Sequence, residues 1–88
     1  MKVTFRNSFL HDLKKVKDQT LLDRVRLAIE QIEAAADLRK IRNLKKITGA
    51  GSYYRIRIGD YRIGLAVEKD MVELVRFLAR KDLYRFFP

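Results

Sequence analysis

The sequence contains no cysteine and no tryptophan, one histidine, one proline and four glycines. Without cysteine there is no disulfide framework and no thiolate metal site, and this is typical of proteins of a reducing compartment, so we expect the cytoplasm. No apolar run approaches the roughly 18 residues that a membrane span needs. The first residues also lack the apolar stretch of a secretory signal, so we expect no membrane partner.

The scarcity of histidine limits the chemistry further. His11 is the single imidazole, which excludes an acid–base pair of two histidines. The Asp, Glu and His residues show no metal-ligand spacing, and no Ser lies near a histidine in a nucleophile motif. We therefore expect no metal and no other cofactor. The candidates that remain are arginines, lysines and tyrosines, which suit electrostatic stabilisation of an anionic transition state with a phenol as proton carrier.

Acidic residues are few: 11 Asp and Glu stand against 20 Lys and Arg, for a net charge of +9. Eight of the basic residues and a single acid, Asp60, lie between positions 38 and 62. Concentrated positive charge indicates a polyanionic partner. Much of this charge sits on or just before predicted strands, whereas membrane binding favours a basic amphipathic helix. Nucleic acid is therefore favoured over an anionic membrane.

The stretch from Tyr53 to Val67 predicts a β-hairpin. It alternates with period two on both sides of Gly59-Asp60, which is typical of a two-residue turn. The predicted cross-strand pairs are Ile58 with Tyr61, Arg57 with Arg62, Ile56 with Ile63, and Arg55 with Gly64. One face then carries the core side chains Tyr54, Ile56, Ile58, Tyr61, Ile63 and Leu65.

The other face of this hairpin carries Arg55, Arg57 and Arg62, with Tyr53 on the same side. Like charges directly opposite each other destabilise paired strands by about 0.2–1 kcal/mol. An anion that normally binds there explains the pattern, and a solvated face rich in arginine is the alternative interpretation.

The rest of the chain predicts a strand at residues 2–6, two amphipathic helices and an interior strand at 71–79. Asn7 or Ser8 is expected to cap the first helix, and Asp18 or Thr20 the second. Residues 38–44 suggest a helical turn or folded loop, residues 48–52 a flexible loop, and residues 80–86 a closing helical turn. We expect Arg76 to form a surface ion pair with Glu73 or Asp82. The prediction is one α+β domain over residues 1–88, in the order β-α-α-β-β-β, with an antiparallel sheet of about four strands and a helical hairpin on one face.

Taken together, the strings Leu44-Lys45-Lys46-Ile47, YYRIRIGDYRIG and Leu78-Ala79-Arg80-Lys81-Asp82-Leu83-Tyr84 resemble the RelE branch of the RelE/ParE toxin superfamily. The resemblance covers nearly the whole chain. It implies a toxin of a type II toxin–antitoxin system that cuts mRNA in the A site of the 30S subunit, close to rRNA. It also implies metal-free attack by the 2′-hydroxyl, which leaves a 2′,3′-cyclic phosphate and a 5′-hydroxyl, and a cognate antitoxin that wraps the toxin.

The resemblance also implies roles for individual residues. The implied catalytic set is Arg55, Arg57, Arg62, Arg80 and Tyr84. Within it, Arg62 and Arg80 would grip the scissile phosphate, and Tyr84 would assist proton transfer or stack on a base. The implied RNA-binding set is Lys45, Lys46 and Tyr53. Because arginine keeps its proton in proteins, Arg55 and Arg57 cannot act as a general base, and the sequence leaves the base open.

Two other functions stay open at this point. One is a ParE-like protein that inhibits DNA gyrase by binding it, which needs no phosphate pocket. The other is a catalytically inactive relative that binds RNA or an antitoxin. Cleavage of mRNA on programmed ribosomes, measured beside gyrase supercoiling, separates the three.

Overall fold

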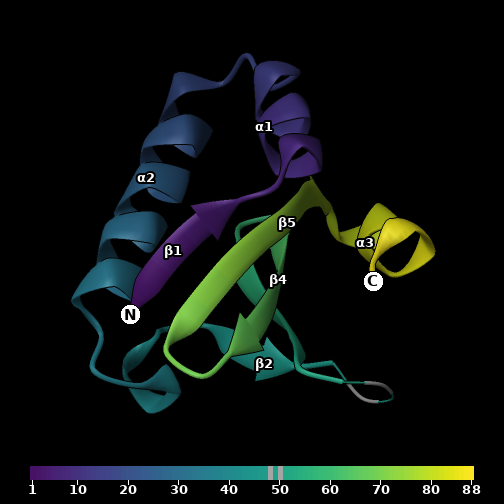
Figure 1. The fold of residues 1–88 in the computed structure, drawn as a ribbon. Helices are drawn as coiled ribbons and strands as arrows, with labels where there is room; N and C mark the ends of the chain where they lie inside the picture. The colour runs from purple at the N-terminus through teal and green to yellow at the C-terminus, as the bar shows by residue number, and fades with distance from the viewer. Residues whose placement is uncertain (48, 50) are drawn as a thin grey trace.

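The computed structural model describes residues 1–47, 49 and 51–88 (Figure 1). Its elements, in chain order, are β1 (Lys2–Phe5), α1 (Asn7–Lys14), α2 (Gln19–Ala34), the 3₁₀ helix η1 (Leu38–Lys40), β2 (Leu44–Lys46), β3 (Tyr53–Ile58), β4 (Tyr61–Glu68), β5 (Met71–Ala79) and α3 (Arg80–Phe86). The predicted flexible loop at 48–52 includes Thr48 and Ala50, which lie outside the described residues.

The strands form one sheet in the order β1-β5-β4-β3-β2. The predicted α+β class is confirmed, and the sheet differs in two respects from the antiparallel sheet of about four strands that was predicted. β1 pairs with β5 in parallel, so the sheet is mixed, and β2 is a fifth strand. The apolar residues Leu38, Ile41 and Leu44 run from the start of η1 to the start of β2, so the predicted helical turn is present only as η1. A strand of three residues is too short to show its own period.

The predicted hairpin is confirmed in every pair. β3 and β4 join across Gly59-Asp60 with Ile58 opposite Tyr61, and Arg57 lies opposite Arg62. Gly59 has φ of +59°, a left-handed conformation that glycine adopts without a steric penalty. Because side chains alternate along a strand, this register fixes which residues face the core and which face away.

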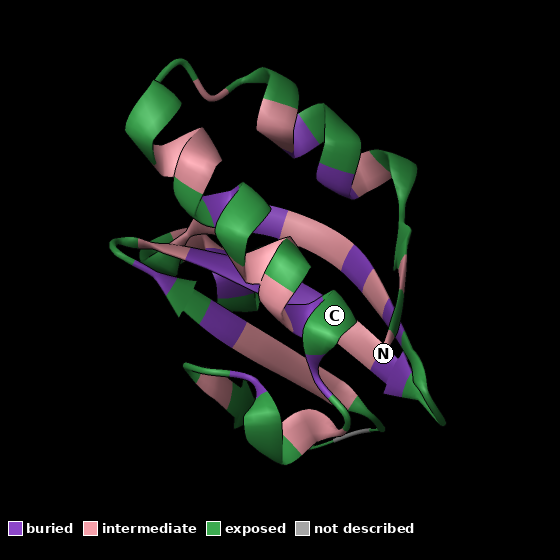
Figure 2. Ribbon diagram, turned by 90° about the vertical axis from the view of Figure 1, so that its left-hand side faces the viewer, coloured by how far each residue is buried: buried purple, intermediate pink, exposed green. Residues whose placement is uncertain are grey.

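Helices α1 and α2 cover one face of the sheet (Figures 1 and 2). Their buried residues meet those of the sheet in one core: Phe9, Val25 and Ile32 from the helices, and Ile56, Ile58, Ile63, Leu65, Val72, Leu74 and Phe77 from the strands. Asp18 caps α2 as predicted, because its carboxylate accepts a hydrogen bond from the Leu21 backbone N–H at 3.3 Å. The cap predicted for α1 is wrong: Arg6 holds the N-cap position, and Asn7 and Ser8 lie inside the helix.

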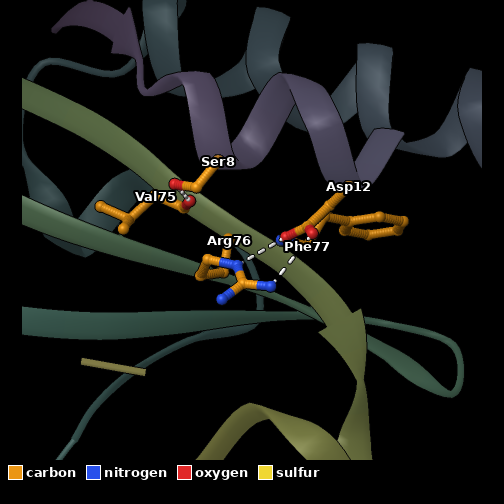
Figure 3. A network of polar contacts seen from close by, with 5 residues as sticks. All are labelled: Ser8, Asp12, Val75, Arg76 and Phe77. Carbon is orange, nitrogen blue, oxygen red and sulfur yellow. Dashed lines mark hydrogen bonds and ion pairs between the residues drawn. The ribbon is translucent and has the colours of Figure 1, made fainter. Parts of the chain in front are cut away.

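Helix α1 also covers the open edge of β5 (Figure 3). β1 pairs with β5 only as far as Leu74, so the residues that follow have no neighbouring strand on that side. Ser8 Oγ donates to the Val75 carbonyl, and the buried Asp12 carboxylate accepts from the Phe77 backbone N–H at 2.9 Å. Two side chains one helical turn apart thus take the place of a strand backbone.

The prediction that Arg76 pairs with Glu73 or Asp82 is wrong, because Arg76 pairs with Asp12. The Arg76 guanidinium forms a bidentate ion pair with the Asp12 carboxylate, from Nε at 2.8 Å and Nη2 at 3.1 Å. This hydrogen bonding and the attraction of the Asp12 charge raise the pKa of Arg76. Glu73 pairs instead with Arg6 at 3.1 Å.

The closing helix α3 lies on the other side of the sheet and carries a small apolar contact of its own. Leu83 and Phe87 are both buried, although neither belongs to the main core. The Phe87 ring sits over Gly64 in β4, where an added Cβ would lie 2.7 Å from it, and meets the Tyr53 ring edge to face at 5.5 Å. This contact fixes α3 against the face that carries the arginines.

None of the helices in the part of the chain that the structure describes has the length and apolarity to cross a membrane.

Candidate functional site

Four arginines and one tyrosine gather on the face of the sheet opposite α1 and α2. Arg55 and Arg57 alternate with the buried residues of β3, Arg62 lies directly across from Arg57, and α3 supplies Arg80 and Tyr84. The Arg55 Nε–H donates to the Tyr84 hydroxyl oxygen at 3.0 Å, which joins the end of the chain to the hairpin. The structure therefore brings together all five residues of the implied catalytic set.

Exposure differs within this group. Tyr84 is 60% exposed, and Arg57 and Arg80 are also exposed, while Arg55 is half-buried. Arg62 is 7% exposed. Burial lowers the pKa of Arg62, and the positive charges of Arg55, Arg80 and Arg57 lower it further. Such repulsion among cations favours the binding of an anion.

Arg62 also fixes the turn of the hairpin. Its Nη1 donates to the carbonyls of Gly59 and Tyr61, both at 2.9 Å. From the other side, the Arg80 backbone N–H donates to the Asp60 carbonyl at 2.8 Å. The turn between β3 and β4 is thus tied to both the arginine cluster and α3.

An open cavity of about 600 Å³ lies beside this turn and is lined by Asp60, Ala79, Arg80, Lys81 and Tyr84. From the sequence, Asp60 was predicted only as a turn residue. Its negative charge could have singled it out, because Asp60 is the one acidic residue between positions 38 and 62, where eight residues are basic.

The implied RNA-binding residues divide between the two faces. Tyr53 shares the site face with Arg55, two residues further along β3, and Lys45 lies opposite Arg55 across the β2–β3 pair. Lys46 lies opposite Tyr54, so its side chain leaves the sheet on the face of α1 and α2. Lys45 and Tyr53 therefore extend the site, and Lys46 does not.

Other chemistries find less support in this arrangement. Within residues 1–47, 49 and 51–88, no three His, Asp or Glu side chains are grouped as metal ligands would be. His11 is exposed on α1 and does not line the cavity beside Tyr84. What the site offers is fixed positive charge, a phenol hydroxyl and one carboxylate.

A mixed sheet with a helical pair on one face and an arginine-rich site on the other defines the class of toxins from type II toxin–antitoxin systems. Residues 3–84 match the family described as "ParE toxin of type II toxin-antitoxin system, parDE", and the chain belongs to this family. Within it the chain is a RelE-type toxin, since it is 42% identical over 89 residues to Toxin RelE3 of Methanocaldococcus jannaschii, with all of both chains covered.

Solved structures agree with this assignment. A chain of the RelB-RelE antitoxin-toxin complex from Methanococcus jannaschii is 39% identical, with a TM-score of 0.81 over 97% of this chain and 99% of that one. The archaeal RelE-RelB complex from Pyrococcus horikoshii gives a TM-score of 0.74 at 20% identity, over 93% and 97% of the two chains. The latter similarity shows the fold alone.

Proposed function

We propose that this toxin is a ribosome-dependent endoribonuclease that cleaves mRNA in the ribosomal A site. The observation that carries the proposal is the cluster of Arg55, Arg57, Arg62 and Arg80 around the Tyr84 hydroxyl. Positive charge fixed in this way suits a phosphate whose negative charge grows during the reaction. The likeness to RelE-type toxins supports the same activity.

In the proposed reaction, the 2′-hydroxyl of the substrate attacks the adjacent phosphorus and the bond to the 5′-oxygen breaks. The products are a 2′,3′-cyclic phosphate and a 5′-hydroxyl. Arg55 and Arg80 stabilise the charge on the phosphate oxygens, and Arg62 adds its charge from a buried position. Since the Tyr84 oxygen accepts from Arg55, its own O–H remains available as a donor to the leaving oxygen.

The surface around the cluster would hold the RNA. We assign base stacking to Tyr53 and contact with the messenger or rRNA backbone to Lys45, which lies beside Arg55. Lys46 would reach a different strand or a different part of the ribosome, because it lies on the opposite face. The ribosome supplies the alignment that an open site of this kind does not impose by itself.

We also propose that a cognate antitoxin inhibits this protein. The similar toxin of Methanococcus jannaschii was solved in complex with RelB. An acidic, amphipathic segment would match a toxin with a net charge of +9.

The test is cleavage of mRNA on programmed ribosomes, mapped by primer extension. We expect cuts at fixed codon positions with the unaltered protein and at least a tenfold loss of rate with Arg80→Ala or Tyr84→Phe. Arg26→Ala is the matched control, because this exposed arginine on α2 belongs to the opposite face and pairs with Asp23. Intact mRNA with every variant, the unaltered protein included, would refute the proposal.

Inhibition of DNA gyrase is the second candidate, and the family description, which names ParE, favours it. A supercoiling assay run beside the ribosome assay separates the two. Loss of supercoiling with intact mRNA would establish the gyrase function. Intact mRNA together with unimpaired supercoiling would indicate an inactive RNA- or antitoxin-binding relative.

A further inference from the structure

We propose that Asp60 is the general base that accepts the proton of the attacking 2′-hydroxyl. The inference rests on the proposed function, for which the sequence left the base open. Three observations carry it: the way the turn is held, the cavity that Asp60 lines, and the chemistry of the other residues in that cavity.

Three hydrogen bonds hold the backbone of the turn that carries Asp60. The carbonyls of Gly59, Asp60 and Tyr61 each accept a hydrogen bond of 2.8 or 2.9 Å, two from Arg62 and one from the backbone of Arg80. Two of the three donors thus come from a buried guanidinium at the centre of the cationic cluster. These bonds fix the point from which the Asp60 side chain extends relative to Arg62 and Arg80.

Asp60 lines the same open cavity as Arg80 and Tyr84. Its carboxylate takes part in none of the ion pairs or side-chain hydrogen bonds formed by the described residues, although Arg80 and Lys81 line the cavity too. Its carboxylate is therefore exposed and free to accept a proton beside Arg80 and Tyr84.

The other groups of the site suit this step less well. Lys81 also lines the cavity, but an ammonium group offers only hydrogen-bond donors. The arginines keep their protons at any working pH. The oxygen of Tyr84 already accepts from Arg55, which suits the phenol to donating its proton. His11 does not line the cavity, and Asp60 supplies its single carboxylate.

Protons and bonds balance in the proposed step. Asp60 takes the proton of the 2′-hydroxyl while the 2′-oxygen forms a bond to phosphorus, and the bond from phosphorus to the 5′-oxygen breaks. Tyr84 gives its proton to the departing 5′-oxygen. Asp60 then releases its proton to water, and Tyr84 takes one back, so both groups return to their starting states.

The first experiment compares Asp60→Asn with Asp70→Asn in single-turnover cleavage on programmed ribosomes. Asp70 is the matched control because it lies in the β4–β5 turn, which does not line this cavity. We expect a loss of about 100-fold with Asp60→Asn and no change with Asp70→Asn. Asp60→Glu, which keeps a carboxylate, should restore part of the rate.

Measuring the affinity for ribosomes distinguishes a catalytic role of Asp60 from a role of its charge alone. Asparagine removes a negative charge from a cationic cavity, so Asp60→Asn should bind ribosomes at least as tightly as the unaltered protein, and the loss should fall on kcat and not on KM. If Asp60 served only to balance charge, the same variant would bind more tightly and cleave at least as fast, which would overturn the inference.

A modified substrate distinguishes the base from the acid. Sulfur in place of the bridging 5′-oxygen leaves without a proton, so an mRNA with this linkage needs a base but no acid. On this substrate Tyr84→Phe should recover most of its rate, and Asp60→Asn should stay about 100-fold slow. If Asp60→Asn reached the rate of the unaltered protein on this substrate, Asp60 would not be the general base, and the inference would be overturned.

Failure of the inference and failure of the proposed function give different results. An unaltered protein that leaves mRNA intact refutes the function itself, whereas an unaltered protein that cleaves beside an equally active Asp60→Asn refutes the inference alone. Thermal unfolding of each variant checks the fold. Should Asp60→Asn unfold, Asp60→Ser replaces it, with the same two outcomes read from the same assays.

Discussion

At the scale of single residues, Asp12 is the clearest case of a polar group that holds the structure together. It is 4% exposed, accepts two hydrogen bonds from Arg76 and one from the Phe77 backbone, and so joins α1 to β5. Removing one partner of a buried ion pair leaves the other charge and a backbone donor unsatisfied, which costs more than the pair itself contributes.

We predict that Asp12→Ala lowers the free energy of unfolding by about 3 kcal/mol. Urea denaturation measures the loss. Asp23→Ala is the control, since its pairing with Arg26 at 3.8 Å is exposed and should be worth less than about 1 kcal/mol. Equal losses in the two variants would contradict the role assigned to Asp12.

The Asp12–Arg76 pair also shows where sequence patterns stop being informative. Period two along the hairpin predicted which face each of Arg55, Arg57 and Arg62 would occupy, because alternation is a local property of a strand. The partner of Arg76 depends instead on where β1 ends along β5, which no local period records. Sequence proximity suggested Glu73 and Asp82, and the true partner is 64 residues away.

At the scale of elements, the hairpin carries an electrostatic cost. Arg57 and Arg62 lie directly opposite each other. Burial lowers the pKa of Arg62 most, and the charges of Arg55, Arg80 and Arg57 lower it further. Strands that keep such a pair trade stability for a binding surface.

We predict that Arg57→Thr raises the free energy of unfolding by about 0.2–1 kcal/mol while it slows cleavage. The gain should be larger at low ionic strength than in about 0.5 M salt, because salt screens the repulsion that the substitution removes. Arg57→Lys keeps the charge and should give no gain. Urea denaturation at the two salt concentrations provides the measurement, and a gain that ignores salt would rule out the electrostatic explanation.

The second element whose position matters is α3, which carries Arg80 and Tyr84. It is held by Phe87, whose ring occupies the space that a side chain at residue 64 would need. The closing helical turn itself was predicted from the sequence. This contact was not, because the absence of a side chain at Gly64 leaves no pattern to read.

We predict that substitutions at Gly64 and Phe87 have strongly non-additive effects on the free energy of unfolding. Gly64→Ala should cost about 2 kcal/mol, because its Cβ would lie 2.7 Å from the Phe87 ring, and Phe87→Ala about 3 kcal/mol. The double variant should be hardly less stable than Phe87→Ala alone, since the clash disappears with the ring. Both single variants should also slow cleavage by loosening Tyr84 from Arg55. A double-mutant cycle in urea tests this, and additive losses would contradict it.

At the scale of the whole molecule, the fold places the main core on one face of the sheet and the arginines of the site on the other. The main core is shared by one face of the sheet and by α1 and α2, and this leaves the other face to the arginines and to α3. Element order and fold class followed from periodicity, whereas the parallel pairing of β1 with β5 and the short β2 are set by long-range contacts. In the same way, the sequence predicted which arginines form the cluster but not how far each is buried. The burial of Arg62 follows from the three-dimensional structure alone.

We predict that affinity for a short single-stranded RNA falls steeply with salt. Each phosphate that the protein no longer neutralises should reduce the slope of log K against log salt by about 0.7, so Arg80→Ala should flatten it by roughly that amount. Arg26→Ala should leave the slope unchanged, as its position on α2 is outside the site. Fluorescence anisotropy between about 50 and 200 mM salt checks the prediction. Equal slopes for both variants would show that binding is diffuse.

The way α1 occupies the edge of β5 bears on how this toxin behaves at high concentration. A row of unpaired backbone groups on an outer strand invites another copy to add its own strand, and fibres grow by that route. Here β1 borders β5 as far as Leu74, and beyond it Ser8 and Asp12 fill the hydrogen-bonding positions of Val75 and Phe77. At the far side of the sheet, β2 has only three residues and ends in two lysines. Polymerisation through β5 must therefore begin with detachment of α1. A variant that removes the hydrogen bonds of Asp12 to β5 should aggregate on storage before any other defect is seen.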